Sequence, residues 1–193
     1  MNDWVIISEI DELCVDRMED TMAWSAVVSA IVAAWSLDSL SKGMVIRKIG
    51  TGERRKASEC LTLTNVRNEG GFNGMLSGRP KLLRRVSLAI IINNLIYAYR
   101  ETRFDNAKDR PRCYWVFTGM YLGGALANVH ERMKKGYVTD FAQLRYKCPF
   151  KKGALASSPI FNLADVFIVV GVIGTLIIKF FMFLDRLHPK KRV

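Results

Sequence analysis

Four apolar segments constrain this chain more than any other feature. They are residues 22–37, 86–99, 114–129 and 166–184, and the first three contain no Lys, Arg, Asp or Glu. A helix that crosses a bilayer needs about 20 mostly apolar residues, so the first, third and fourth segments approach that length and the second is shorter. The second also carries Asn93 and Asn94 in its middle. The pattern predicts a mainly α membrane protein with four transmembrane helices.

The fourth segment, VFIVVGVIGTLIIKFFMFL, is hydrophobic around its whole circumference, which favours a membrane span over a helix with one buried stripe. We expect its single charge, Lys179, to reach toward the membrane surface. In the third segment, Gly119 and Gly123 form a G-x-x-x-G motif that allows another helix to approach closely. A soluble bundle of four long buried helices remains the alternative reading, because segments of this length permit it.

Composition excludes several classes of protein. The chain has 193 residues, of which 50% are hydrophobic, and a formal net charge of +11. With 5 Pro, 14 Gly and 4 Cys it is not disordered, collagen-like or a disulfide scaffold. The cysteines form no C-x-x-C pair and there are only 2 His, so we expect no metal site. We expect reduced thiols, although a bridge between Cys60 and Cys148 stays open.

The two ends of the chain differ in charge. Residues 1–20 contain seven acids and one base, which is the opposite of the basic start of a secretory signal. This stretch is interpreted either as a short amphipathic helix, with Trp4, Ile7, Cys14 and Met18 on one face, or as a segment that is absent if translation begins at Met18 or Met22. The predicted organisation is an acidic extension over residues 1–21, a membrane domain over 22–184 and a basic tail over 185–193.

The longest polar stretch, residues 42–85, separates the first two spans. Within it, residues 59–66, ECLTLTNV, alternate with β-branched residues as a strand does. We therefore expect a small β element in this loop, packed on the membrane surface.

Four crossings place the first and third loops on one side of the membrane. Short polar residues then gather there, and acids at the ends of membrane helices are candidates for function. Asp140 and Asp165 are the most informative, because two carboxylates in a poorly hydrated site share a proton and can act as acid and base. The structural alternative for Asp165 is a helix N-cap.

Five local motifs occur in order around these segments: LDSLSK at residues 37–42, NEGG at 68–71, GGALANVHER at 123–132, GYVTDF at 136–141 and FNLAD at 161–165. Together they resemble lipoprotein signal peptidase, or signal peptidase II, the membrane aspartyl protease family of bacteria. The resemblance covers residues 22–184.

The resemblance implies a four-helix membrane aspartic endopeptidase. It would cleave signal peptides from diacylglyceryl-modified prolipoproteins, just before the lipidated cysteine, without a cofactor or metal. Asp140 and Asp165 would be the catalytic pair. The residues that would position the pair and the substrate are Asn128, Arg132, Asn162, Asn68, Asp38 and Lys42. The active site would lie near the extracytoplasmic face of the bacterial cytoplasmic (inner) membrane, with the β element in the first extracytoplasmic loop and membrane lipids and prolipoproteins as partners. We expect a monomer.

This chain departs from the family pattern in several places. The family usually has Gly-Asn and Asp-Arg where this chain has Ala127 before Asn128 and Glu131 before Arg132, Ser41 replaces a Thr, and Gly70, Gly71 and Phe72 shift the first-loop aromatic. A catalytically weak relative that binds lipidated peptides without cleaving them is therefore the alternative function. A nucleic-acid-binding protein is not expected, because the basic residues are scattered over loops.

Charge conflicts with the implied orientation. The first and third loops hold 18 Lys and Arg, whereas the opposite side holds 10. The positive-inside rule would place the predicted active site in the cytoplasm. We expect instead that the basic groups of the long, structured first loop meet anionic lipid head groups.

Overall fold

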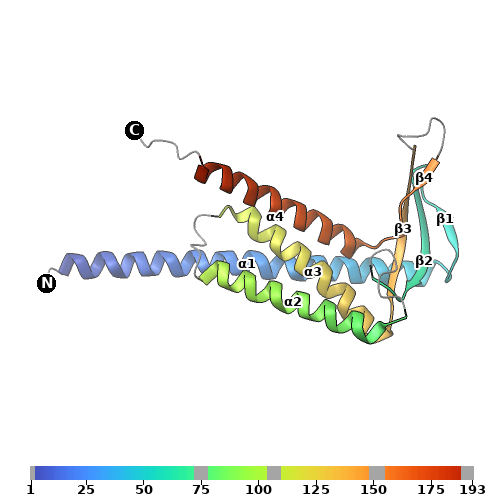
Figure 1. Cartoon of the computed structure of the whole chain (residues 1–193), viewed down its shortest axis with the longest axis horizontal. Coiled ribbons are helices and arrows are strands. Elements are labelled where there is room, and N and C mark those ends of the chain that lie inside the picture. The colour runs from blue at the N-terminus through green and yellow to red at the C-terminus, as the bar shows by residue number, and fades with distance from the viewer. Residues whose placement is uncertain (1–2, 72–77, 104–109, 148–154, 188–193) are drawn as a thin grey trace.

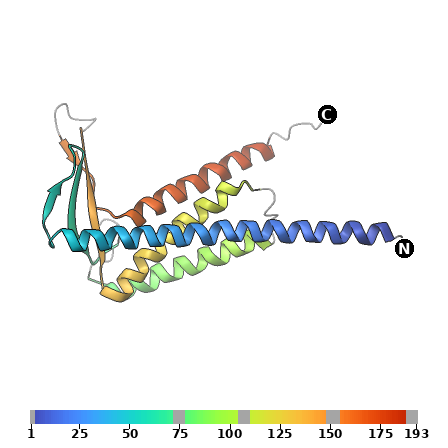
Figure 2. The ribbon, with the colours of Figure 1, turned by 180° about the vertical axis from the view of Figure 1, so that it is seen from behind.

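The computed structural model describes residues 3–71, 78–103, 110–147 and 155–187. Four helices, α1 (Asp3–Lys48), α2 (Pro80–Arg103), α3 (Arg112–Lys135) and α4 (Leu163–Leu187), run side by side. A small sheet closes one end of the bundle, as Figures 1 and 2 show. Its strands are β1 (Arg54–Lys56), β2 (Leu61–Asn68), β3 (Val138–Lys147) and β4 (Leu155–Ser157).

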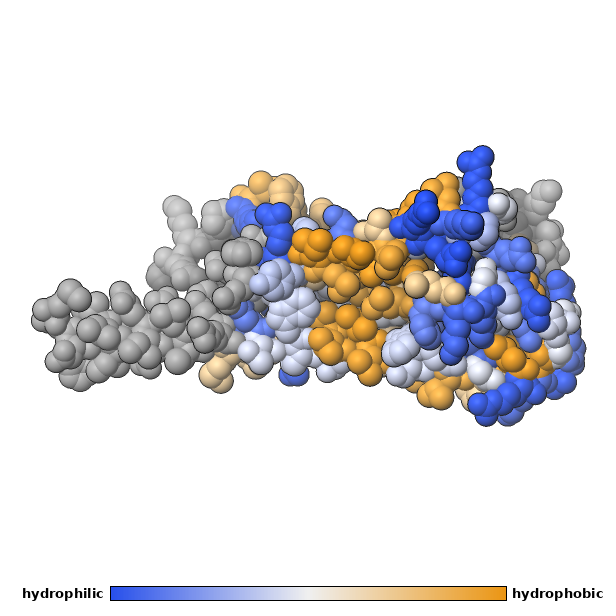
Figure 3. Space-filling view, turned by 90° about the horizontal axis from the view of Figure 1, so that it is seen from below, coloured by the Kyte–Doolittle hydropathy of each residue, from blue (hydrophilic) through white to orange (hydrophobic). Residues whose placement is uncertain are grey.

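Three of the helices in the described part of the chain are long and apolar enough to cross a membrane. These spans are Asp20–Lys48, Pro80–Thr102 and Leu163–Leu187. The structure therefore supports a mostly helical membrane protein, but α3 does not reach the same apolarity, so four spans are not established by length and composition. The short second segment does qualify, because its helix extends well beyond the apolar run. The outer face shows an apolar belt between hydrophilic ends (Figure 3).

Helix α3 lies between α1 and α4, and glycines make this close packing possible. A Cβ on Gly123 would lie 2.6 Å from the carbonyl oxygen of Ile31 on α1, and Gly119 meets α1 in the same way at Val27. On the other side, a Cβ on Gly171 of α4 would lie 2.6 Å from the carbonyl oxygen of Phe117. The prediction that G-x-x-x-G brings a second helix close is confirmed, and the partner is α1.

The sheet joins two loops that are far apart in the sequence. Its four strands are antiparallel in the order β1-β2-β3-β4, so β1 and β2 come from the first loop and β3 and β4 from the third. The expected strand in the first loop is confirmed as β2, whereas the third-loop strands were not predicted. Val66 of β2 pairs with Asp140 of β3, beyond an irregularity in register after Leu63. This pairing fixes the height of Asp140 above the helices.

Helix α1 is one continuous helix of 46 residues. The acidic stretch at the start of the chain is therefore not a separate short helix, because the helix passes through residues 20–22 without a break. The N-terminal part of α1 projects beyond the other helices at the end away from the sheet (Figures 1 and 2). Cys60 and Cys113 carry free, exposed thiols among the described residues. Cys148, the other half of the bridge left open above, lies outside the described residues.

The tight contact between α1 and α3 can be tested with alanine. We expect Gly123→Ala to lower the free energy of unfolding by about 1 to 3 kcal/mol, because the new methyl group meets backbone that cannot move aside. Gly43→Ala is the matched control, since its Cβ would meet nothing within 4 Å and the change should stabilise the helix by up to about 1 kcal/mol. Thermal unfolding in detergent gives both values, and equal melting temperatures for the two variants would contradict the packing.

Candidate active site

All the residues predicted for the site meet where the helices join the sheet. They come from five places in the fold: the C-terminal part of α1, the end of β2, the C-terminal half of α3, the start of β3 and the start of α4. They are Asp38, Lys42, Asn68, Asn128, Arg132, Asp140, Asn162 and Asp165, and hydrogen bonds or ion pairs connect most of them directly.

Asn162 links the two aspartates. Its Nδ2 donates to Oδ1 of Asp140 at 2.7 Å, while its Oδ1 accepts from the backbone N–H of Asp165 at 3.0 Å. Oδ2 of Asp165 in turn accepts from the backbone N–H of Asn162 at 3.1 Å. This reciprocal pair of bonds is a capping box at the start of α4. Asn162 is thus the N-cap and Asp165 the third helical residue, so the alternative that Asp165 is itself the N-cap is wrong.

Asp140 is almost fully buried on β3, with 4% of its surface exposed. Besides Asn162, Nδ2 of Asn68 donates to its Oδ2 at 2.8 Å. Burial raises the pKa of Asp140 to about 6, and the nearby charge of Asp165 acts in the same direction, whereas the Asn68 and Asn162 bonds oppose the shift. A carboxyl group of this kind keeps its proton to a higher pH than an ordinary Asp does, which favours its use as a general acid.

Asp165 has a different environment. It lies in the first turn of α4, where the helix N-terminus favours negative charge. Its Oδ1 accepts from Nδ2 of Asn128 at 2.9 Å. The two carboxyl groups are therefore distinguished by their surroundings: one is buried on a strand and the other accepts N–H groups at a helix end.

Lys42 organises the polar residues below the pair. Its ammonium contacts Asp38 at 2.7 Å and Glu131 at 3.0 Å, and donates to Oδ1 of Asn128 at 2.8 Å. Because Lys has only donors, Asn128 must turn its oxygen to Lys42 and its N–H group to Asp165. Asp38 also accepts from the backbone N–H of Ala164 at 2.8 Å, so α1 caps the start of α4.

Glu131 was noted in the sequence only as a departure from the family pattern, yet it is part of the site. It is 8% exposed and accepts both from the backbone N–H of Thr139 at 3.1 Å and from its hydroxyl at 2.7 Å. Together with the ion pair to Lys42, these bonds hold the residue that precedes Asp140. The sequence did hold one signal that could have placed Glu131 in the site. Glu131 follows Asn128 by three residues, so the two side chains lie on the same face of the helix.

Arg132 completes the site from α3. It is 6% exposed, and its Nη2 donates to the backbone oxygen of Gly70 at 2.6 Å. Its Nε has no hydrogen-bond partner among the described residues. A buried N–H group without a partner is costly, so this donor is available to an acceptor on a bound molecule.

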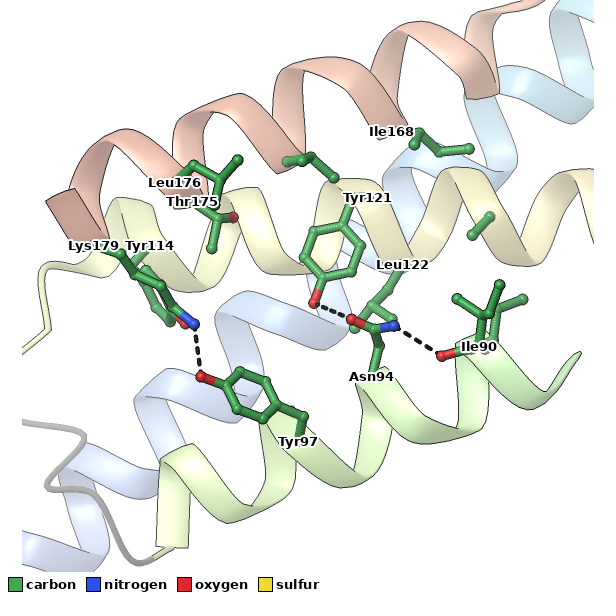
Figure 4. A pocket seen from close by; sticks show the side chains of 13 residues that line it. Ile90, Asn94, Tyr97, Tyr114, Tyr121, Leu122, Ile168, Thr175, Leu176 and Lys179 are labelled. Atoms are coloured by element: carbon green, nitrogen blue, oxygen red, sulfur yellow. Dashed lines mark hydrogen bonds between the residues drawn. The ribbon is translucent and has the colours of Figure 1, made fainter. Parts of the chain in front are cut away.

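A groove of about 330 Å³ lies between α2, α3 and α4, beginning within two turns of the aspartates. Leu122, Ala125 and Ile168 line it on the side of the site, and most of its other lining residues are apolar (Figure 4). Two polar pairs cross it: Tyr121 donates to Asn94 at 3.3 Å, and Lys179 donates to the hydroxyl of Tyr97 at 2.7 Å.

Lys179, expected to reach toward the membrane surface, makes its contacts with α2 near the end of the bundle that lies away from the sheet. Its ammonium points into the groove, where it also forms an ion pair with Glu101 at 3.2 Å. Glu101 is 1% exposed and accepts from the hydroxyl of Tyr114. A buried carboxylate in the last turn of α2 therefore holds the lysine against that helix.

Together, the fold and the site define a helical membrane protein with an enzyme-like centre built on two aspartates that share an asparagine. The family model described as "Signal peptidase (SPase) II" matches residues 30–182. Lipoprotein signal peptidases of Halothermothrix orenii and Halalkalibacterium halodurans are 32% and 31% identical, over 70% and 80% of this chain and 81% and 90% of their own lengths. The chain belongs to the signal peptidase II family and is a peptidase.

The fold agrees with solved structures. A bacterial membrane enzyme solved by the in meso method at 2.3 Å resolution aligns with a TM-score of 0.67 and 23% identity, over 88% of this chain and 94% of that one. A second, at 1.9 Å resolution, has a TM-score of 0.62 and 24% identity, over 79% and 91%. At this identity the likeness concerns the fold alone.

The raised pKa of Asp140 predicts a pH-dependent stability. Between about pH 4, where an unfolded Asp titrates, and about pH 6, the folded chain binds more protons at this site, so stability falls as the pH rises. Asp140→Asn removes this titration. We expect the unfolding free energy of the unmodified chain, relative to that of Asp140→Asn, to fall by about 2 kcal/mol over this window. Chemical denaturation in detergent at a series of pH values measures this difference in unfolding free energy. A difference that does not change with pH would contradict the raised pKa of Asp140.

Proposed function

We propose that this chain is a membrane aspartic endopeptidase that removes signal peptides from diacylglyceryl-modified prolipoproteins, cleaving before the lipidated cysteine. One observation carries the proposal: Asn162 binds Asp140 through its amide nitrogen while it is locked to Asp165 by the capping box. Family membership supplies the reaction class, because the relatives are lipoprotein signal peptidases. This chain covers most of the length of these relatives, which supports assigning it their whole activity.

The different surroundings of the two carboxyl groups support distinct roles in peptide hydrolysis. Asp165, held as an anion, accepts a proton from a water molecule as the oxygen attacks the scissile carbonyl carbon. Asp140, protonated, donates its proton to the carbonyl oxygen. The resulting diol collapses as Asp165 gives the proton it took from water to the amide nitrogen, Asp140 takes back a hydroxyl proton, and the C–N bond breaks. The products are a signal peptide with a new carboxyl terminus and a lipoprotein whose modified cysteine has a free amino group, and no metal or cofactor takes part.

The remaining residues position the pair and the peptide. Lys42 and Asp38 act through Asn128 and the start of α4, and Asn68 acts directly on Asp140. The unpartnered Nε of Arg132 is a donor for a substrate carbonyl. The sheet, which carries Asp140, closes this end of the bundle (Figure 1), and the peptide can lie against it. The groove between α2, α3 and α4 is suited to an acyl chain of the substrate.

The alternative of a peptide-binding relative without activity is less well supported. Its motivation was the change at Glu131, but Glu131 engages both Lys42 and Thr139, so the longer side chain keeps the network connected. Ala127 is 2% exposed in the helix interface. Neither departure leaves the aspartates without their partners.

We also propose that α3 is a fourth membrane span. It lies between α1 and α4, so it presents less surface to lipid and needs fewer apolar residues than the outer helices. The protein then resides as a monomer in the bacterial cytoplasmic (inner) membrane, with the sheet and the aspartates on the extracytoplasmic side. The acidic start of α1 and the basic tail are on the cytoplasmic side.

The catalytic roles predict the effect of removing each carboxyl group. We expect Asp140→Asn and Asp165→Asn each to lower kcat by about 10²- to 10⁴-fold, because acid–base catalysis is lost while the shape of the site is kept. The measurement is cleavage of a diacylglyceryl prolipoprotein in detergent, together with rescue of a strain depleted of its own enzyme. Asp185→Asn, an exposed position on α4, is the control. Full processing by either active-site variant would refute the assignment.

Filling the groove predicts a separate defect. Ala125→Trp places an indole in the groove near the aspartates, so we expect a rise in KM of about tenfold or more through lost acyl-chain contact. Ala33→Trp on the exposed side of α1 is the matched control, because tryptophan is tolerated next to lipid. An unchanged KM for Ala125→Trp would place the acyl chains elsewhere.

Orientation can be tested with the cysteines that the structure exposes. In variants that retain only Cys60 or only Cys113, a membrane-impermeant thiol reagent added to spheroplasts should label Cys60, at the sheet end, and not Cys113, at the start of α3. A cysteine at exposed Tyr146 of β3 should behave like Cys60 if α3 crosses the membrane. Labelling of Cys113 alone would reverse the orientation, and equal labelling of residues 113 and 146 would exclude α3 as a span.

A further inference from the structure

A second hollow, of about 400 Å³, lies at the sheet end of the bundle and is separate from the aspartates and from the groove. We call it the basic hollow. Its lining residues are Lys81, Arg84, Arg85 and Leu88 of α2 and Met133 of α3. It therefore lies between the first two turns of α2 and the last turn of α3.

The three cations share one face of α2. Lys81, Arg84, Arg85 and Leu88 follow the spacing i, i+3, i+4, i+7, which places all four side chains on a single helical stripe. Like charges at this spacing repel one another. None of the three cations has a hydrogen bond or ion pair within the described part of the chain, and the first turn of α2 contains no acid. The described residues therefore leave the positive charge gathered here uncompensated.

The basic hollow lies at the depth where the lipid head groups begin. Candidate span Pro80–Thr102 starts here, and α2 exposes Val86 and Ile90 in the next turns. Leu88 and Met133 give the hollow an apolar wall. Their side chains are 41% and 58% exposed, so this wall is open to a partner. Figure 3 shows a hydrophilic surface at this end that borders directly on the apolar belt.

This combination selects one kind of partner. An acidic protein or a nucleic acid would match the cations but not the apolar wall, and it would have to reach the edge of a membrane span. An anionic phospholipid matches both, because its phosphate group takes the charges and its acyl chains continue along Leu88 and Met133 into the bilayer. Basic residues at this depth each favour an anionic lipid surface.

We propose that the basic hollow binds one anionic phospholipid, with the phosphate between Lys81, Arg84 and Arg85 and the acyl chains against Leu88 and Met133. The bound lipid is an attachment of α2 to the bilayer and is distinct from the substrate of the peptidase. The proposal does not depend on which leaflet faces the cytoplasm. Lipid binding here would explain part of the excess positive charge of the first loop.

The test uses the full chain purified in detergent and native mass spectrometry with added phosphatidylglycerol or phosphatidylcholine. We expect the unmodified chain to retain one phosphatidylglycerol with about tenfold preference over phosphatidylcholine. The triple variant Lys81→Gln/Arg84→Gln/Arg85→Gln should lose this preference. The matched control, Arg47→Gln/Lys48→Gln/Arg54→Gln, removes three exposed cations at the same end of the molecule and should keep it. Circular dichroism melting verifies that each variant is folded.

Further arms separate the alternatives. Inorganic phosphate in excess should not displace the lipid, because it lacks the acyl chains, and Leu88→Ser should weaken retention while leaving all the cations in place. Equal loss in both triple variants would mean diffuse charge attraction and would overturn the site. Displacement by phosphate alone, or retention that ignores head-group charge, would overturn it as well. If the first triple variant unfolds, Arg84→Gln and Leu88→Ser carry the comparison singly.

Discussion

Two carboxyl groups brought close together, one buried and one half-buried, are the constraint around which this structure is arranged. Ionised carboxylates in a desolvated site repel each other and lose hydration, so the fold must supply donors that water no longer provides. Three asparagine amides do so, and each is oriented by a donor on its oxygen: Lys42 for Asn128, the Asp165 N–H for Asn162 and the Gly70 N–H for Asn68. Each of the three amide groups therefore donates one N–H to a carboxylate.

The same network fastens the helices to the sheet. Asp38 on α1 caps the start of α4, Glu131 on α3 holds Thr139 on β3, and Lys42 connects both acids. Removing one partner of such a buried cluster leaves an uncompensated charge, which costs about 3 to 5 kcal/mol. Site geometry and the stability of this end of the bundle are thus coupled. At the opposite end, Glu101, Lys179 and Arg110 form a separate charged cluster.

Much of the candidate site could be predicted from the sequence. The order of motifs and apolar segments along a membrane protein determines which loops lie on the same side of the membrane. The chain departs from expectation where contacts across the sequence decide. Strand β3 was missed, although Val138, Phe141 and Tyr146 favour strands, because a strand forms only when a partner such as β2 is available to pair with it. Glu131 was seen as a deviation, and its role emerged only from Lys42 and Thr139 on other elements. Lys179 is held against α2 because Glu101, on that helix, is buried opposite it.

By itself, the sequence determined the helical membrane class and the close approach at Gly119 and Gly123, and it named most of the residues that meet in the candidate site, since apolar length, small side chains and ordered motifs are local properties. Only the tertiary structure decided that the capping box of α4 reaches Asp140 through Asn162, that the sheet draws strands from two loops, and that α3 lies between α1 and α4. These features depend on hydrogen-bond direction and packing between segments as far as 126 residues apart, which no local pattern encodes.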